Sequence, residues 1–215
     1  MKTVLNSKIA LLCCLLLVAS CGNAPQQTTT ISQIGQIIDQ LGPSEPGPTT
    51  TQIRASLTPE VMAQFGNAAL KVAAIEKPPL SSVLIGVGQN GDVETFTTPD
   101  GVSFSFRNGM LVATRGLGAD LMTADTGASL RAIRAGQGAG VVRIHRYLDG
   151  EDQIIVRSFV CTIRRDQNTM LRESCQSPSF AFENTYQIGP QGGIVGSRQW
   201  VSPERGYLSV EDIRN

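Results

Sequence analysis

Apolar and polar residues alternate along the centre of the chain, and this alternation predicts β-strands. Val102, Phe104 and Phe106 are separated by single serines, which is the period-two pattern of a strand with one buried face. Asn-Gly and Asp-Gly pairs suit the type I′ turns of hairpins, because both central residues of such a turn need positive φ. These pairs are Asn90-Gly91, Asp100-Gly101 and Asn108-Gly109. The pattern predicts an antiparallel meander with strands over 83–89, 92–98, 102–107 and 110–115.

A second β-rich block follows a glycine-rich stretch. Residues 116–140 hold six glycines, and we interpret them as a long connection with one helical turn. The strands predicted beyond it cover 141–148, 153–165, 170–176, 180–188 and 194–201. About ten strands with few helices predict an all-β fold, either an antiparallel barrel-like structure or a strongly curved sheet.

The last hairpin of this block can be given a register from its loop, residues 189–193. If Ile188 faces Ile194, then the pairs that follow are Tyr186 with Gly196, Asn184 with Arg198, and Phe182 with Trp200. An aromatic ring opposite a glycine fills the missing side-chain volume. An unpaired polar group among aromatic rings is costly, so Asn184 and Arg198 require either a wet cavity or an internal partner.

Two short helices are predicted before the strands. Isoleucine and leucine recur at helical spacing over residues 31–41, and Gly42-Pro43 ends this amphipathic segment. Thr58 supplies a capping hydroxyl, Pro59 suits the first helical position and Glu60 places an acid in the first turn. A second helix is therefore predicted from Thr58 to about Gly66.

The first 20 residues read as a secretory signal peptide. Lys2 and Lys8 precede an apolar run of ten residues, too short to span a bilayer, which needs roughly 20. Residues 18–21, Val-Ala-Ser-Cys, match the bacterial lipoprotein processing box, in which Cys21 becomes the acylated first residue. Two or more acyl chains such as palmitate anchor a protein stably. Gly22 fits sorting to the outer membrane, and the alternative is an ordinary signal peptide with a free Cys21.

These segments divide the chain into three parts. Residues 1–20 are the signal peptide, 21–52 a lipidated tether with a short helix, and 53–215 a single β-barrel-like domain. Basic and acidic residues number 18 each, and removal of the signal peptide takes two lysines, which leaves the mature chain weakly negative. Nucleic-acid binding needs a basic surface, so the composition argues against a nucleic-acid partner.

Two cysteines remain in the domain, Cys161 and Cys175. In an oxidising compartment a disulfide between them is the default expectation. Such a bridge could contribute roughly 3 kcal/mol in the chain-entropy description. The alternative is a metal site, but two cysteines and one distant histidine lack the usual paired spacing, so no metal is predicted.

Candidate catalytic groups are few. His145 is the single histidine and would have to serve any Ser-His-Asp or Cys-His arrangement, but it lies in an arginine-rich strand where we expect a solvated face. Asp149, Glu151 and Asp152 could supply the carboxylate pair of a glycosidase, whereas their place in a Gly-containing hairpin loop favours turn formation. Phosphate-binding, metalloprotease and EF-hand motifs are missing from the sequence, so neither catalysis nor a cofactor is predicted.

Polar residues near glycines or aromatic residues are the remaining candidates for ligand or partner contacts. Arg115 and Asp120 flank two glycines and form either an internal pair at a bulged strand exit or such a contact. Tyr186, Trp200 and Tyr207 could stack on sugar rings or belong to the core. A set of arginines faces either anionic polysaccharide or lipid headgroups, or plain solvent. They are Arg143, Arg146, Arg157, Arg164 and Arg165.

Several stretches together resemble one known family. The most specific is Leu-Val-Ala-Thr-Arg-Gly-Leu-Gly-Ala-Asp-Leu at 111–121. The others are the lipoprotein processing box, Glu183-Asn184-Thr185-Tyr186, Ser197-Arg198-Gln199-Trp200 and Gly206-Tyr207. Over roughly residues 55–210 the chain resembles the group 4 capsule polysaccharide lipoproteins (YjbF/GfcB-like). The cysteine pair and segment 22–52 depart from the resemblance.

The resemblance implies a periplasm-facing outer-membrane lipoprotein with a barrel-like β-fold. It further implies a role in capsule or exopolysaccharide production or export, beside a large outer-membrane β-barrel exporter and other periplasmic components. It supplies no catalytic residues. The expected function is therefore a non-enzymatic accessory that contacts the exporter, the polysaccharide or both. The alternatives are a carrier with a continuous apolar cavity for a lipid or lipid-linked glycan and, less favoured, a glycan-active enzyme with two carboxylates in a cleft.

Overall fold

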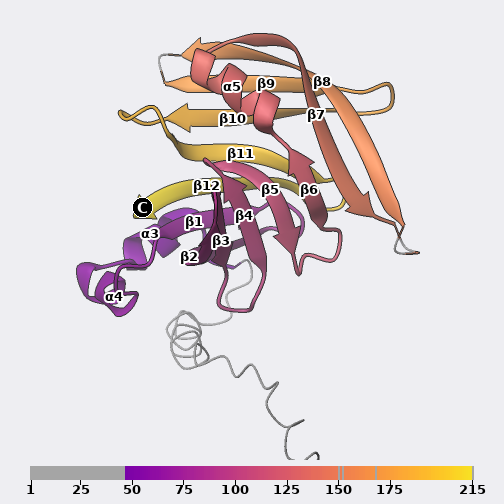
Figure 1. Cartoon of the computed structure of the whole chain (residues 1–215). Helices are drawn as coiled ribbons and strands as arrows, with labels where there is room; N and C mark the ends of the chain where they lie inside the picture. The colour runs from indigo at the N-terminus through magenta and orange to yellow at the C-terminus, as the bar shows by residue number, and fades with distance from the viewer. Residues whose placement is uncertain (1–46, 150, 152, 168, 215) are drawn as a thin grey trace, which may run out of the picture.

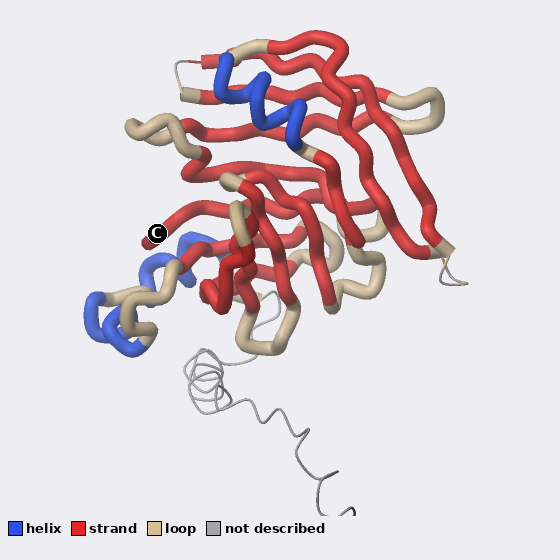
Figure 2. The backbone as a smooth tube through the Cα atoms, viewed as in Figure 1, coloured by secondary structure: helices blue, strands red, loops and turns tan. Residues whose placement is uncertain are grey.

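A computed structural model describes residues 47–149, 151, 153–167 and 169–214. In this part of the chain twelve strands form a single sheet that curves into a nearly closed barrel (Figure 1). Three short helices accompany the sheet (Figure 2). The all-β, barrel-like prediction is confirmed, and the strands are slightly more numerous than the number expected.

The strands and helices alternate with short turns. The first strands are β1 (Leu70–Ile75), β2 (Leu80–Asn90), β3 (Val93–Thr97), β4 (Ser103–Arg107), β5 (Met110–Arg115) and β6 (Leu121–Asp125). The others are β7 (Gly138–Leu148), β8 (Ile154–Gln167), β9 (Met170–Gln176), β10 (Ala181–Ile188), β11 (Ile194–Ser202) and β12 (Gly206–Arg214). The helices are α3 (Thr50–Ser56), α4 (Pro59–Gln64) and α5 (Gly127–Ala135).

The connection between consecutive strands explains why the sheet nearly closes. Its strand order is β5-β4-β3-β2-β1-β12-β11-β10-β9-β8-β7-β6, and every neighbouring pair is antiparallel. The two edge strands, β5 and β6, are consecutive in the chain, so the short loop 116–120 holds the two edges of the sheet beside each other. A strand edge left open exposes unpaired backbone groups, and here the two edges face each other.

The predicted meander is present, but its turns differ in detail. At Asn108-Gly109 both residues have positive φ, 49° and 81°, as a type I′ turn requires. At residues 90–91 and 100–101 only the glycines, Gly91 and Gly101, have positive φ. Those two turns are therefore not type I′, although glycine is needed at each of them.

The predicted register of the β10–β11 hairpin is correct at its loop and wrong beyond it. Ile188 pairs with Ile194, but Gln187 pairs with Gly196 and Thr185 with Arg198. One extra residue, Val195, forms a bulge between the first two pairs and shifts all later partners by one. Asn184 and Arg198 therefore do not face each other, and they point to opposite faces of the sheet.

The helices also differ in part from expectation. The helix expected at 58–66 is present as α4, capped by Thr58 with Pro59 at its start. The connection 116–140 contains strand β6 and the nine-residue helix α5 in place of one helical turn, and α3 was not expected. The helix expected at 31–41 and the signal peptide lie outside the described residues.

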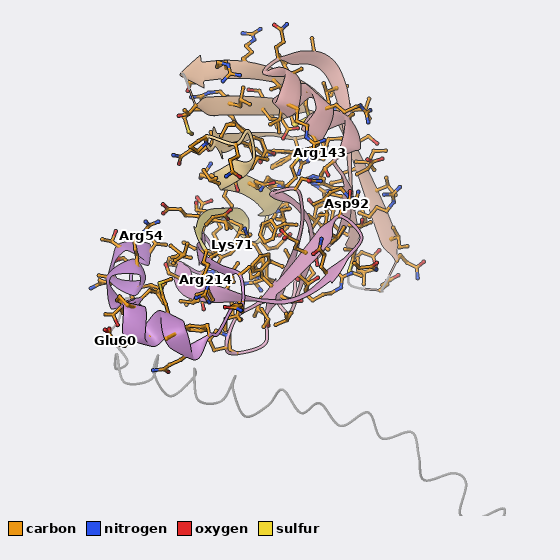
Figure 3. All side chains as sticks on the ribbon, turned by 60° about the vertical axis from the view of Figure 1, so that its left-hand side comes forward. Arg54, Glu60, Lys71, Asp92, Arg143 and Arg214 are labelled. Atoms are coloured by element: carbon orange, nitrogen blue, oxygen red, sulfur yellow. A yellow bond between two sulfur atoms is a disulfide. The ribbon has the colours of Figure 1, made fainter. Side chains whose placement is uncertain are left out.

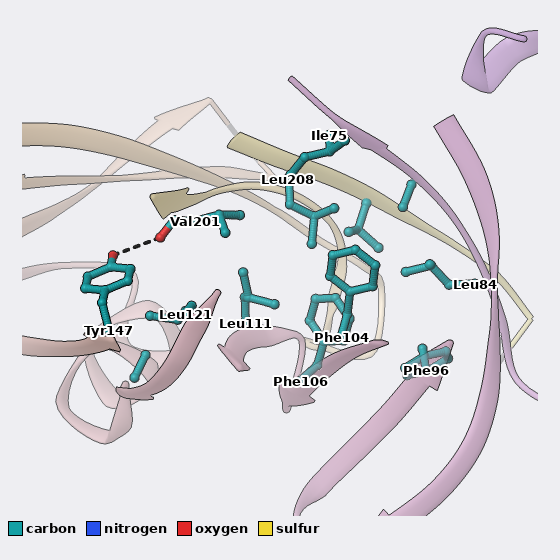
Figure 4. Close-up of a cluster of buried hydrophobic side chains, with 13 residues drawn as sticks. Ile75, Leu84, Phe96, Phe104, Phe106, Leu111, Leu121, Tyr147, Val201 and Leu208 are labelled. Carbon is teal, nitrogen blue, oxygen red and sulfur yellow. Dashed lines mark hydrogen bonds between the residues drawn. The ribbon is translucent and has the colours of Figure 1, made fainter. Parts of the chain in front are cut away.

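The barrel interior is filled by aliphatic and aromatic side chains. As the alternation predicted, Phe104 and Phe106 are buried while Ser103 and Ser105 are partly exposed. These rings pack with Phe96, Leu111 and Leu208 in one cluster (Figure 4). A second cluster lies beneath α5, whose Leu130 and Ile133 contact the inner face around β8–β11.

The predicted disulfide is present. Cys161 on β8 and Cys175 on β9 are paired residues of adjacent strands, and their sulfurs are bonded. Both side chains are buried. The Glu173 carboxylate lies near the two sulfurs, but thiolates are the form that binds metal, and in the bridge neither sulfur is a thiolate.

Candidate functional site

A buried polar network occupies the barrel interior between β7, β9 and β10. Arg143 donates to Glu173 Oε2 over 3.0 Å, and Tyr186 and Asn184 donate to the same oxygen over 2.7 and 2.8 Å. All four side chains are fully buried, and Figure 3 shows Arg143 inside the molecule. Asn184 Oδ1 also accepts from the backbone of Trp200. The internal partner that Asn184 requires is therefore Glu173, not Arg198.

The network continues along β7 to His145. Arg143 Nε donates to His145 Nε2 over 2.8 Å, and His145 Nδ1 lies 2.9 Å from Tyr147 Oη, which donates to Val201 O. His145 is fully buried, so the expectation of a solvated face was wrong. The cause is that residues 143, 145 and 147 share one face of β7, and this face is the interior. The network pairs most of its polar atoms there, while Arg143 Nη2 and Glu173 Oε1 have no hydrogen-bond partner within the described residues.

Burial and neighbouring charges fix the protonation of these groups. Burial, together with the adjacent Arg143 guanidinium, holds the pKa of His145 well below its usual value. Burial alone would raise the pKa of Glu173, but Arg143 and the hydrogen bonds from Asn184 and Tyr186 outweigh it and lower the pKa. Glu173 is therefore ionised and His145 neutral at neutral pH. Burial and the Arg143–Glu173 pair thus hold both groups in one protonation state at neutral pH.

We expect the free energy of unfolding to decrease as the pH is lowered below about 6.5, the pKa of histidine in the unfolded chain. The unfolded chain binds a proton there that buried His145 does not, so stability is lost by up to about 1.4 kcal/mol per pH unit. Urea unfolding between pH 5 and 8 measures this slope. The His145→Gln variant, which keeps an acceptor for Arg143, should show a shallower slope, and equal slopes would contradict the assignment.

The family-specific stretch 111–121 closes the seam between β5 and β6. Asp120 accepts from Thr114 Oγ1 over 2.7 Å and from the backbone of Gly116 and Leu117 over 3.0 and 3.2 Å. Arg115 donates to three backbone oxygens, of Thr114, Leu121 and Met122. Within the described residues these two side chains bond to backbone groups and, for Asp120, to the Thr114 hydroxyl, and not to each other. Arg115 and Asp120 thus hold the connection between the two edge strands in place.

Gln199 ties β5 and the preceding turn to β11 across the interior. It lies in one of the stretches that carry the family resemblance, but it was not among the predicted contact residues. Its Oε1 accepts from Leu111 N over 2.8 Å and its Nε2 donates to Gly109 O over 2.9 Å. A side-chain amide thereby pairs with β5 in the manner of a neighbouring strand. Side chains from β5 and β11 thus bridge the gap at the edge of β5 that β4 leaves unpaired.

Two of the aromatic candidates, Tyr186 and Trp200, belong to the core, and Tyr207 is partly exposed beside it. Tyr186 is fully buried and Trp200 is 8% exposed, so neither presents a face to a sugar. Tyr207 packs edge-on against Trp200, and the Arg198 guanidinium lies 3.4 Å from the centre of the Tyr207 ring. Arg198 also lies 3.6 Å from Glu76, which places it on the outer surface.

The other charged candidates are distributed over different surfaces. Asp149 accepts from the backbone of Glu151 and Gln153, which is the turn role that was favoured, and Asp152 lies outside the described residues. Arg143 is buried, so the arginines do not form one solvated face. Arg146 and Arg157 are partly buried, while Arg164 and Arg165 are exposed.

Two cavities of the described chain lie at opposite ends of the β1–β5 strands. The apolar end cavity, about 360 Å³, is lined chiefly by aliphatic residues and Phe104, near the 98–102 turn and Leu80. The polar end cavity, about 440 Å³, lies at the opposite ends of the strands, beside α5 and the 189–193 loop. Its polar lining is Lys71, Glu94, Asn108, Arg134, Gln191 and Asp212. Between them Phe96, Phe106 and Leu111 are at most 1% exposed, so the interior is filled.

The comparisons with known proteins agree with this fold. The hypothetical lipoprotein YmcC from Escherichia coli (K12) is 14% identical, with a TM-score of 0.61, and the match covers 78% of this chain and 96% of that one. Such identity shows likeness of fold alone. No curated protein matches the chain. Among the described helices none has the length and apolar character needed to cross a bilayer.

A match to a protein family shows more than the likeness of fold. The family is described as "Group 4 capsule polysaccharide lipoprotein gfcB, YjbF", and the match extends over residues 48–213. This span includes every strand of the barrel, the seam formed by 111–121 and both end cavities. The chain therefore belongs to the YjbF family of group 4 capsule polysaccharide lipoproteins.

Proposed function

We propose that this protein is an outer-membrane lipoprotein that faces the periplasm and acts as a non-enzymatic accessory in capsule or exopolysaccharide production or secretion. The observation that carries the proposal is the family match over residues 48–213. The processing box ending at Cys21 supports an acylated anchor. An anchor holds the domain at the membrane and raises its effective concentration for an embedded exporter without new contacts.

The chemistry of the interior supports a role without catalysis. The only histidine is neutral and buried, and the buried carboxylate of Glu173 is ionised and paired with Arg143. Acid–base catalysis needs a group that reaches the substrate and titrates near the working pH. Neither group meets this requirement.

An exposed aliphatic surface supports a partner contact. Val142 pairs with Val160 and Leu148 with Ile154 across β7 and β8, so their side chains lie on the same face of the strand pair, which we call the β7–β8 outer face. Ser158 and Arg146 lie on this face between them. Its members are between 42% and 67% exposed: Val142, Leu148, Ile154, Val156 and Val160. Apolar patches of this kind mark interaction sites on soluble domains. We assign this face to the β-barrel exporter.

We expect the acylated protein, purified from detergent-solubilised outer membranes, to bring down an outer-membrane β-barrel protein. The Val156→Glu variant should recover far less of it, because a carboxylate on the β7–β8 outer face would be buried unpaired in the interface. Quantitative mass spectrometry of the recovered proteins measures the effect.

Val87→Glu is the matched control, since Val87 is 41% exposed on β2, outside this face. It should recover as much exporter as the wild type. Recovery of no β-barrel protein by the wild type, or an equal loss with both variants, would contradict the proposed contact.

The apolar end cavity favours a second candidate function, that of a carrier for the acyl chain of a lipid or lipid-linked glycan. Its volume of about 360 Å³ lies within the range of small-ligand sites. The filled interior beyond it leaves no continuous passage through the described barrel. Lipid extracted from the same purified protein distinguishes the candidates, because a carrier retains a stoichiometric lipid besides the anchor.

A further inference from the structure

The polar end cavity brings together side chains from separate parts of the chain. Glu94 lies on β3, Asn108 in the β4–β5 turn, Arg134 near the end of α5 and Gln191 in the β10–β11 loop. The cavity of about 440 Å³ is larger than the apolar one. Convergent polar groups around a sizeable cavity are the ordinary features of a ligand site.

These four side chains are available to a ligand. Within the described residues, Glu94, Asn108, Arg134 and Gln191 have no hydrogen-bond or ion-pair partner in the protein. Arg134 offers only donors, Glu94 accepts, and the two amides do both. The set can therefore bind hydroxyl groups, each of which donates one hydrogen bond and accepts others.

The floor of the cavity is rigid. Lys71 donates to Asp212 over 2.5 Å and its ammonium lies 4.7 Å from the ring centre of Phe96 and 5.8 Å from that of Phe106. Lys71 is 5% exposed, and Figure 3 shows it well inside the molecular outline. A buried and paired cation of this kind holds its geometry, so the site needs little rearrangement to bind.

The charges of the cavity balance. Lys71 and Arg134 are positive, and Glu94 and Asp212 are negative. A phosphate or a uronate would meet repulsion from the carboxylates as well as attraction from the cations, and recognition of anions ordinarily uses an excess of arginine. Balanced charges with free donors and acceptors favour an uncharged ligand rich in hydroxyl groups.

We propose that the polar end cavity binds a short uncharged stretch of polysaccharide. The proposal rests on the proposed function, which places the protein beside a polysaccharide, and adds to it a direct contact with the glycan. The residues that bind hydroxyl groups are Glu94, Asn108, Arg134 and Gln191. Gly192 and Gly193 also line the cavity, and a Cβ placed on either glycine meets nothing within 4 Å.

Filling the cavity gives the sharpest test. Gly193 lines the cavity and does not have positive φ, so Gly193→Phe adds a ring to the lining without backbone strain. Gly47→Phe is the matched control, since Gly47 also has open space around its Cα and lies outside the cavity. Arg134→Ala with Gln191→Ala removes hydrogen bonds and leaves the space open.

The probes are oligosaccharides made by partial hydrolysis of the cell's own exopolysaccharide and separated by charge into neutral and acidic fractions. Binding to the full acylated protein in detergent is measured by calorimetry. The wild type and Gly47→Phe should bind the neutral fraction. Gly193→Phe and the double variant should bind it about tenfold more weakly or worse, the loss that corresponds to one or two hydrogen bonds.

Three outcomes would overturn the proposal: no binding by the wild type, preference for the acidic fraction, or unchanged binding by Gly193→Phe and the double variant. Recovery of the exporter is measured on the same preparations. If the exporter is recovered but no oligosaccharide binds, the saccharide site is wrong and the accessory function stands. If oligosaccharide binds but no exporter is recovered, the contact with the exporter is wrong.

Discussion

Replacing Glu173 with alanine is expected to lower the free energy of unfolding by about 3–5 kcal/mol, the usual cost of removing one partner of a buried ion pair. The Arg143 guanidinium would remain fully buried without a counter-charge, and Asn184 and Tyr186 would lose their shared acceptor. The shift of the urea midpoint at constant m-value measures the loss.

Glu183→Ala provides the control for this experiment. Glu183 is ion-paired with Arg172 on the neighbouring strand, but both side chains are more than 40% exposed, and such pairs contribute about 1 kcal/mol or less. A loss in Glu173→Ala no larger than that in Glu183→Ala would contradict the assignment of the network as the main polar support of the interior.

Replacing Cys21 with alanine is expected to remove the protein from the outer-membrane fraction. Without the cysteine no acyl chains can be attached, and the remaining apolar run of ten residues is too short to span a bilayer. Density fractionation of cell membranes with immunoblotting measures the redistribution, and mass spectrometry of the N-terminal peptide measures the lost acyl groups.

Cys13→Ala is the matched control, because Cys13 lies within the predicted signal peptide and is absent from the mature chain. This variant should remain acylated and fractionate as the wild type does. Retention of Cys21→Ala in the outer membrane in normal amount would show that the attachment does not depend on the acyl chains.

The sequence carried enough information to predict the strands because their signals are local. Alternation in Val102–Phe106 and the glycines of the hairpin turns specify strands and turns within a few residues. The Cys161–Cys175 pair was predictable from redox context and number. These signals led to the all-β fold and to most of the strands before any three-dimensional information.

The interior network was not predictable, because alternation alone does not tell which face of a strand is buried. On β7 arginine and histidine alternate with Ile144 and Arg146, and the usual rule places the charged residues outside. The rule fails because Glu173 and Tyr186 come from strands 30 and 43 residues away from Arg143. Contacts between residues so far apart in the sequence cannot be recognised from the local alternation of apolar and polar residues.

The hairpin register shows a second limit. A bulge at Val195 changes the partner of each later residue on β11, and nothing in the loop sequence 189–193 distinguishes it from a regular hairpin. For that reason Arg198, expected among aromatic residues inside, lies outside against Tyr207. A single inserted residue thus moved one candidate from the core to the surface.

The two proposed ligands are assigned to cavities at opposite ends of the barrel. The apolar end cavity suits an acyl chain, the polar end cavity suits a saccharide, and the filled interior separates them. The β7–β8 outer face is a third surface, distinct from the lining of both cavities. The contacts proposed for the exporter and for the glycan therefore use different residues.

The most direct measurement of the central claim is the amount of polysaccharide at the surface of cells that lack this protein. We predict that its loss strongly reduces surface polysaccharide, that the wild-type chain restores it, and that Cys21→Ala restores it poorly because the domain is no longer held at the membrane. Undiminished surface polysaccharide in the deletion strain would contradict the account.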